Sequence, residues 1–208
     1  MRMCIDRMLL ITTLAICILT SVMVISSVSF AKVIAQMEHM HNNNATIDTG
    51  PKAYKMYENS TLGIKLQHPR DWPVSAHKIG PTMVIKFNST RQSEMDTIPP
   101  VVLISIGKLP PGNKTLADLT RINKAEAAKT KGFHLIESNA TKLGGLDAKK
   151  IIYSYNSYDP SLTFPLNSMD IWTVNNGKKY TFSFIDTQHE FTKQLPTVKK
   201  ILDSLEIK

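Results

Sequence analysis

Four side chains able to ligate a metal ion occur within five residues of one another: Met37, His39, Met40 and His41. Thioether and imidazole groups are soft or borderline ligands that suit copper and zinc. Two histidines separated by one residue also place their imidazole rings close together. The sequence therefore predicts a weak copper or zinc site here. A flexible tether is the alternative, because the stretch is short and no further ligand is held nearby.

The other histidines are scattered along the chain: His68, His77, His134 and His189. His68 is the most suggestive, because it lies beside Pro69 and Asp71 at the end of a predicted strand. No nucleophile elbow, zinc-protease helix, P-loop or dinucleotide-binding motif occurs. Both cysteines, Cys4 and Cys17, lie in the N-terminal segment, which excludes a catalytic cysteine and a disulfide from the rest of the chain.

Three aspartates can converge from neighbouring loops of the fold: Asp159, Asp170 and Asp186. Carboxylates suit calcium, but the sequence contains no EF-hand loop. Since no catalytic motif occurs, we expect a non-enzymatic protein without a cofactor, apart from a weakly bound copper, zinc or calcium ion.

Residues 1–31 differ in composition from the rest of the 208-residue chain. Arg2 and Arg7 precede an uncharged run at 8–31, and about 20 apolar residues suffice to cross a hydrocarbon layer. The run is predicted to be either a cleaved signal peptide, with a small-residue site at 29–31, or a retained transmembrane anchor. Both alternatives leave the basic end inside and export the remainder, either secreted or anchored to the membrane.

Residues 32–52 are predicted to be a flexible spacer, because they contain three consecutive asparagines and an Asp-Thr-Gly-Pro sequence. The residues that follow, 53–208, suffice for one compact domain. A formal net charge of +8 suits an exported domain that meets anionic headgroups or an acidic partner. A solvated lysine-rich surface is the alternative, and nucleic acid is not expected outside the cell.

Five Asn-x-Ser/Thr sequons lie in the spacer or at predicted turns: Asn44, Asn59, Asn88, Asn113 and Asn139. Sequons mark surface loops in secreted proteins. Asn, Ser and Thr are also ordinary turn residues, which is the alternative explanation. The number of sequons leads us to expect a glycosylated exterior.

The stretch 62–73 predicts a strand that ends abruptly. Leu62, Ile64 and Leu66 alternate with glycine or polar residues, and Pro69 then stops ladder pairing. Trp72 follows, and its large ring needs a pocket. We therefore predict that Trp72 packs into the core.

The remaining pattern predicts mainly strands, over 54–57, 74–77, 83–87, 101–106, 133–138, 148–155, 169–174 and 179–185. Asn175-Asn176-Gly177 predicts a tight hairpin between the last two, because asparagine and glycine accept positive φ. Capping boxes at Thr115 and at Thr187 are predicted to open two helices. Pro196 interrupts the apolar stripe of the last helix and predicts a kink or a break. An antiparallel sheet with helices packed on it belongs to the α+β class.

The chain from about Tyr54 to Ile207 resembles the PsbP-like family, whose relatives include archaeal exported proteins and the photosystem II extrinsic subunit. At the front, the matching residues are Tyr57, Gly63, Ile64, Pro69 and Trp72. Toward the end, they are Trp172, the run Asn176-Gly177-Lys178-Lys179-Tyr180-Thr181-Phe182, Phe191, Ile201, Ser204, Leu205 and Ile207. The resemblance covers nearly the whole domain, through motifs that are individually loose.

The resemblance implies an α-β-α sandwich on a central antiparallel sheet. It also implies an assembly or binding module, and photosynthetic members influence calcium and chloride retention. No ligand site of the family matches here, so the signature residues are expected to be structural: Gly63, Pro69, Trp72, Trp172, Gly177 and Ser204. We expect an extracytoplasmic module with a protein partner in the envelope. An envelope metal-binding protein is the alternative.

Overall fold

The computed structural model describes residues 53–208 apart from 91–97, 110, 113–114, 158–161 and 163. Several predictions from the sequence lie outside the described residues. They concern the apolar segment 1–31, the spacer 32–52 with its methionines and histidines, two of the sequons, and Asp159.

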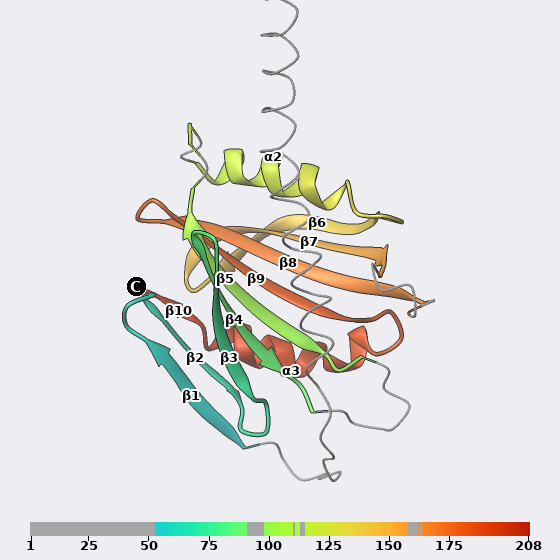
Figure 1. The fold of residues 1–208 in the computed structure, drawn as a ribbon, viewed down its shortest axis with the longest axis horizontal. Coiled ribbons are helices and arrows are strands. Elements are labelled where there is room, and N and C mark those ends of the chain that lie inside the picture. Colours follow the sequence, from blue (N-terminus) through green and yellow to red (C-terminus); the bar gives the residue numbers. More distant parts are fainter. Residues whose placement is uncertain (1–52, 91–97, 110, 113–114, 158–161, 163) are drawn as a thin grey trace, which may run out of the picture. The chain divides into compact units, whose positions relative to one another are not determined.

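Within the described residues, ten strands form two antiparallel sheets (Figure 1). The three-stranded sheet has the order β1-β2-β10, and the seven-stranded sheet has the order β3-β4-β5-β9-β8-β7-β6. The strands are β1 (Tyr54–Asn59), β2 (Ile64–Pro69), β3 (Val74–Ile79), β4 (Thr82–Asn88), β5 (Val101–Lys108), β6 (His134–Leu143), β7 (Leu146–Asn156), β8 (Pro165–Asn175), β9 (Lys178–Thr187) and β10 (Glu206–Ile207). All are joined by antiparallel pairing, as predicted.

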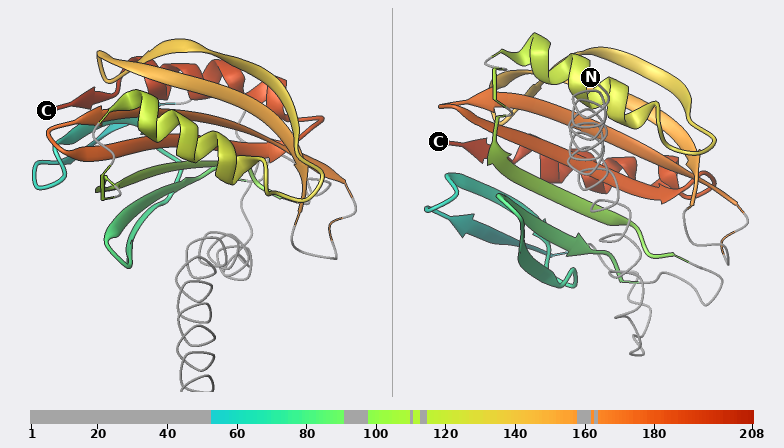
Figure 2. Two further views of the ribbon diagram at one scale, coloured as in Figure 1. Left: turned by 90° about the horizontal axis from the view of Figure 1, so that it is seen from above. Right: turned by 45° about the horizontal axis from the view of Figure 1, so that its top comes forward.

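Two helices cover opposite faces of the seven-stranded sheet: α2 (Leu116–Ala127) and α3 (Phe191–Asp203) (Figure 2). Adjacent residues of a strand point to opposite faces. In β8, Trp172 packs in one cluster with Leu119 of α2, and Ile171 packs in the main core with Val198 of α3. This arrangement confirms the predicted α+β class and the helix–sheet–helix layering.

The predicted strand and turn at 62–73 are confirmed. β2 buries Ile64 and Leu66 and ends at Pro69. Trp72 has 0% of its surface exposed and belongs to the main core. Its burial explains why the chain turns so sharply between β2 and β3.

The predicted Asn-Gly hairpin is also confirmed. Asn176 and Gly177 have φ angles of 47° and 72°, and they join β8 to β9. This left-handed conformation costs little for glycine and asparagine, and it matches the twist of a two-residue hairpin. The hairpin places Tyr180, Phe182 and Phe184 in the core on one face of β9.

The helix starts agree only in part with the sequence. The Thr115–Asp118 capping box opens α2, with both reciprocal hydrogen bonds present. The second predicted box is present only in part: Thr187 Oγ1 accepts a hydrogen bond from the Glu190 N–H at 3.3 Å, but the Glu190 side chain makes no reciprocal bond and α3 begins only at Phe191. The Glu190 carboxylate instead accepts a hydrogen bond from Lys193 Nζ at 2.7 Å.

The predicted break at Pro196 is wrong, because α3 runs without interruption from Phe191 to Asp203. The alternative, a kink at Pro196, stays a prediction. The missing proline N–H deprives the carbonyl of Thr192 of its helical partner. Thr192 and Pro196 are both exposed, so water can reach that side of the helix. Buried Phe191 and Val198 hold the helix against the core on either side of the proline.

Candidate functional site

His68, the histidine that the sequence analysis singled out, lies at the end of β2 and is buried. His68 has 1% of its surface exposed, and its ring centroid lies 5.0 Å from that of Phe87. Burial, together with the positive charge of Lys55, lowers the pKa of His68. Asp71 is exposed and accepts a hydrogen bond from the Thr90 hydroxyl at 3.0 Å. His68 is therefore a neutral core residue.

Two nitrogen atoms of this turn lack a hydrogen-bond partner among the described residues. They are His68 Nδ1 and Trp72 Nε1, and both are buried. A buried donor without a partner costs about 1–3 kcal/mol relative to the hydrated group. The turn is thus held by apolar packing, in spite of its polar atoms.

Asp170, on β8, is the centre of the best-connected polar network in the described structure. Its carboxylate accepts hydrogen bonds from the Tyr153 hydroxyl at 3.0 Å and the Ser168 hydroxyl at 3.1 Å. Ser183, directly opposite on β9, donates a third. Strand pairing among β7, β8 and β9 brings these four residues together on the face that α2 covers.

Burial and the hydrogen-bond network act in opposite directions on the pKa of Asp170. Burial raises the pKa of Asp170, although the hydrogen bonds from Ser183, Tyr153 and Ser168 oppose that effect. Burial and the neighbouring Asp170 raise the pKa of Tyr153 well above its ordinary value. Two residues further along β8, Trp172 Nε1 donates a hydrogen bond to the Thr120 hydroxyl at 3.0 Å, which links α2 to the sheet. These groups act as a framework beneath α2.

The described aspartates do not converge, contrary to the prediction. Asp170 lies on the α2 face of the sheet, whereas Asp186 shares the opposite face with Phe182 and Phe184. Asp186 Oδ1 accepts a hydrogen bond from the Thr187 N–H at 2.7 Å. Strand alternation separates the two carboxylates, so they cannot share a calcium ion.

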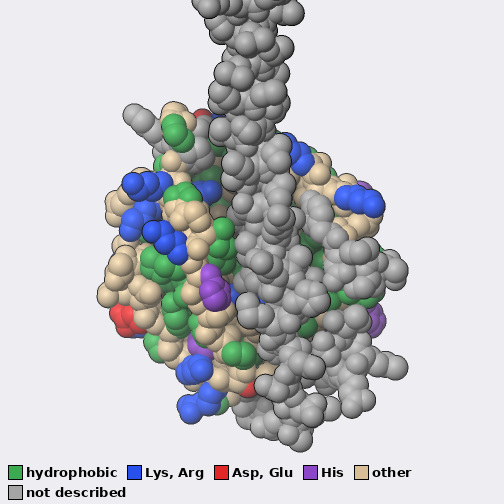
Figure 3. All heavy atoms as spheres, in the orientation of Figure 1, with side chains coloured by type: hydrophobic (Ala, Val, Ile, Leu, Met, Phe, Trp, Pro, Cys, Tyr) green, Lys and Arg blue, Asp and Glu red, His purple; other side chains and the backbone are tan. Residues whose placement is uncertain are grey.

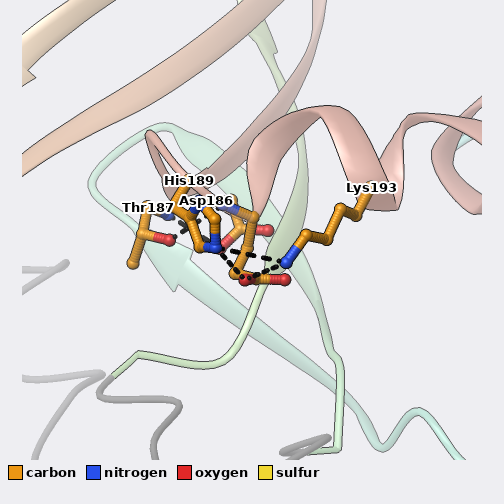
Figure 4. Close-up of polar contacts among 5 residues, drawn as sticks. Asp186, Thr187, His189 and Lys193 are labelled. Atoms are coloured by element: carbon orange, nitrogen blue, oxygen red, sulfur yellow. Dashed lines mark hydrogen bonds and ion pairs between the residues drawn. The ribbon is translucent and has the colours of Figure 1, made fainter.

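A second polar group lies at the start of α3 (Figure 4). Lys193 Nζ lies 2.7 Å from Glu190 Oε1 and 3.3 Å from His189 Nε2. Lys193 and His189 are exposed, which limits the strength of the ion pair. Within the part of the chain that the structure describes, no three histidine, cysteine or acidic side chains are arranged to hold a metal ion.

The signature residues lie in the framework. Gly63 has a φ of +69°, and a Cβ there would lie 2.9 Å from the carbonyl oxygen of Lys208. Ser204 Oγ accepts a hydrogen bond from the Gln67 N–H at 2.9 Å and donates to the Ile201 carbonyl at 2.8 Å. These contacts fasten the C-terminal strand β10 and the end of α3 to β2.

The three described sequons differ in accessibility. Asn139 is exposed on the edge strand β6, and its amide donates to Glu137. Asn59 accepts a hydrogen bond from the Leu62 N–H at 3.1 Å, which makes it a turn residue. Asn88 is half-buried at the end of β4. Asn44 and Asn113 lie outside the described residues.

Sequence reasoning missed a group of lysines. Lys108 ends β5 and stands directly opposite Lys178, which begins β9, and Lys179 follows beside Gly107. We call Lys108, Lys178 and Lys179 the lysine end of the sheet. The sequence does not show that Lys108 meets Lys178, because β5 and β9 are separated by about 70 residues and their pairing register exists only in the folded chain.

No helix within the described ranges, α2 and α3 included, is both long and apolar enough to cross a bilayer. The apolar segment 1–31 lies outside those ranges.

Comparison with known proteins identified relatives by structure only. No family model matches the chain, and no curated protein matches its sequence. Similar solved structures include the cyanobacterial PsbP (CyanoP) from Synechocystis sp. PCC 6803, with a TM-score of 0.52 and 15% identity. The match covers 79% of this chain and 98% of that chain.

Two further solved structures share the architecture. LpqN, involved in cell envelope biogenesis of Mycobacterium tuberculosis, has a TM-score of 0.50 and 16% identity over 78% of this chain and 88% of its own. The Saccharomyces cerevisiae Ran-binding protein Mog1p has a TM-score of 0.50 and 8% identity over 76% of this chain and 96% of its own. At these identities the likeness establishes a PsbP-like fold.

Proposed function

We propose that this PsbP-like domain is a non-catalytic binding or assembly module of the cell envelope. In this proposal the N-terminal segment carries an archaeal-type exported domain across the membrane and either anchors it there or is cleaved. The domain then binds a protein partner on the outer side.

The observation that carries the proposal is how the domain uses its polar groups. His68 is buried beside Phe87, and Asp170 is held by three hydroxyl groups beneath α2. His77, His134 and His189 are exposed on different strands and loops. A general acid–base pair needs two titratable groups within reach of one substrate atom. The groups available for chemistry in the described residues are instead framework residues or exposed surface residues, and His189 contacts Glu190 and Lys193 in a surface ion-pair group.

The structural neighbours also support a binding role. Mog1p binds Ran, and LpqN is involved in cell envelope biogenesis. Their shared fold carries different functions, so the fold alone does not identify the partner of this chain. An uncharged run of more than 20 residues at 8–31 supports export, because such a run suits a signal peptide or an anchor.

Crosslinking in intact native cells tests the proposal. The full-length chain, with a C-terminal affinity tag, is crosslinked and purified from the envelope fraction. The control keeps residues 1–52 and replaces the domain with an unrelated one. We expect a stoichiometric protein that crosslinks to the chain and is absent from the control.

A protease added outside intact cells provides the matching test of location. We expect the domain to be digested while a cytoplasmic marker survives. Recovery of the uncrosslinked chain alone would contradict a binding role, and protection of the domain until the cells are lysed would contradict export.

A further inference from the structure

The lysine end gathers three positive charges on neighbouring strands. Lys108 and Lys178 are exposed and directly opposite each other in the β5–β9 pair. The Lys179 side chain passes over Gly107, where its Cε would lie 3.4 Å from an added Cβ. Lysine and arginine side chains gather on the side of the molecule where the β8–β9 hairpin lies (Figure 3).

The described part of the domain does not neutralise this charge. None of these three lysines forms an ion pair with a described carboxylate. At the same edge, Asp147 pairs with Lys142 at 2.6 Å, and Asp118 is engaged in the capping box of α2. Like charges directly opposite each other in a sheet are destabilising. The domain therefore keeps an unfavourable pair that an external anion would relieve.

Burial also makes the positive charge of Lys179 less favourable. Removal from water lowers the pKa of Lys179, so its positive charge is less stable in the isolated domain than it is in water. A bound carboxylate would raise the pKa of Lys179 again, because a nearby opposite charge favours the ammonium form.

The lysine end lies far from the point at which the chain enters the domain. Ala53 precedes β1, and its carbonyl accepts a hydrogen bond from the Arg70 N–H at 2.7 Å, close to the turn that begins β3. Strand β5 begins at that edge and ends at Lys108 after eight residues. Eight residues of strand span roughly 25 Å. In Figure 1 the start of β1 lies toward the bottom of the domain and the β8–β9 hairpin lies at the upper left.

We propose that the lysine end, formed by Lys108, Lys178 and Lys179, is the docking surface for an acidic segment of a partner protein. This inference rests on the proposed function and names the chemistry of its partner. A run of aspartates or glutamates can place carboxylates against Lys108 and Lys178, which share one face of the sheet, and against Lys179, which points to the opposite face. An extended acidic chain can wrap the end of the sheet in this way, whereas a flat layer of headgroups meets one face, which favours a protein segment over a membrane surface.

The test measures binding of the full-length chain, in detergent micelles, to a fluorescent peptide of ten glutamates. A peptide of ten glutamines is the uncharged control. The test variant is K108E/K178E/K179E. The matched control is K55E/K124E/K131E, which changes the net charge equally at three exposed and separated lysines.

We expect the cluster variant to weaken glutamate-peptide binding at least tenfold and the dispersed variant to weaken it less than threefold. Binding by the wild type should weaken as salt is raised, because exposed charges are screened. Equal losses in the two variants would overturn the proposal, since net charge alone would then explain binding. Vesicles with 30% phosphatidylglycerol are the second probe. Loss of vesicle binding in the cluster variant, without loss of peptide binding, would assign the surface to the membrane and overturn the proposal.

The single variant K178E separates binding from stability. It places a carboxylate opposite Lys108 and should raise the melting temperature by one or more degrees while lowering peptide affinity. A lower melting temperature would indicate that Lys178 stabilises the domain and would contradict the docking role. If crosslinking captures a partner equally with wild type and the cluster variant, the proposed function stands and the lysine end is refuted.

Discussion

The two tryptophans offer a direct test of how this core is stabilised. Both are essentially fully buried, with exposed fractions of 0% for Trp72 and 1% for Trp172. They differ in the indole N–H. Trp172 Nε1 donates to Thr120 Oγ1 at 3.0 Å, whereas Trp72 Nε1 has no partner among the described residues. Replacing each by phenylalanine removes the same atoms from two different hydrogen-bonding environments.

The expected free-energy changes follow from this contrast. Each replacement removes roughly 40 Å³ of ring, which costs about 1 kcal/mol as a cavity at ~24 cal/mol per Å³ and about 1 kcal/mol in lost transfer free energy. For Trp72, removal of an unpartnered buried donor returns about 2 kcal/mol, so W72F should be nearly neutral. For Trp172, the lost hydrogen bond adds about 1 kcal/mol, so W172F should destabilise by about 3 kcal/mol.

Urea unfolding of the full-length chain at pH 7 provides the measurement. Far-UV circular dichroism is the suitable signal, because tryptophan fluorescence itself changes in these variants. Fits with a shared denaturant slope give the change in the free energy of unfolding. W72A is the companion variant and should cost about 3–5 kcal/mol, because it removes the whole side chain from the core.

Two results would refute the reasoning. If W72F costs as much as W172F, then the Trp72 N–H has a partner, such as a buried water or a bound molecule, and the turn is more than an apolar anchor. If W72A is tolerated with less than about 1 kcal/mol of destabilisation, then the ring does not occupy the core that the structure shows.

Three further predictions concern buried or strained positions. Asp170 has a raised pKa, so the melting temperature of the wild type should fall as pH rises from about 4 toward the folded-state pKa of Asp170. D170N should abolish this dependence of melting temperature on pH, and an unchanged dependence would contradict the prediction. His68 has a lowered pKa, so the wild type should lose stability as pH falls below about 6.5, and H68F should remove this loss; identical pH profiles in urea unfolding would count against it. Gly63 has a φ of +69° and a Cβ would lie 2.9 Å from the Lys208 carbonyl oxygen, so G63A should cost about 2–3 kcal/mol by urea unfolding. The control G112A, at a φ of +78° with open space around it, should cost only about 1 kcal/mol, and equal costs would show that the approach to Lys208 is not tight.

Features set by neighbouring residues could be predicted well. The Asn176-Gly177 hairpin, the Thr115 capping box and the strand ending at Pro69 each depend on interactions within a few residues. The break at Pro196 was mispredicted, because packing of Phe191 and Val198 outweighs a local cost that propensity alone would make decisive.

The candidate sites were much less predictable. The suggestion that Asp170 and Asp186 meet failed, because strand register assigns them to opposite faces of the sheet. The hydroxyl groups around Asp170 come from β7, β8 and β9, and their convergence depends on which strands are neighbours. A single sequence contains little information about such pairings, since they join residues that are far apart along the chain.

The sequence by itself determined the α+β class, the strand that stops before Trp72, the burial of Trp72 and the apolar segment that suggests export. These properties follow from hydrophobic period and from residues that restrict the backbone. Only the tertiary structure decided that Trp72 lacks a hydrogen-bond partner while Trp172 has one, and that Lys108 stands against Lys178. Those facts depend on long-range register, because antiparallel pairing brings together side chains that no local pattern connects.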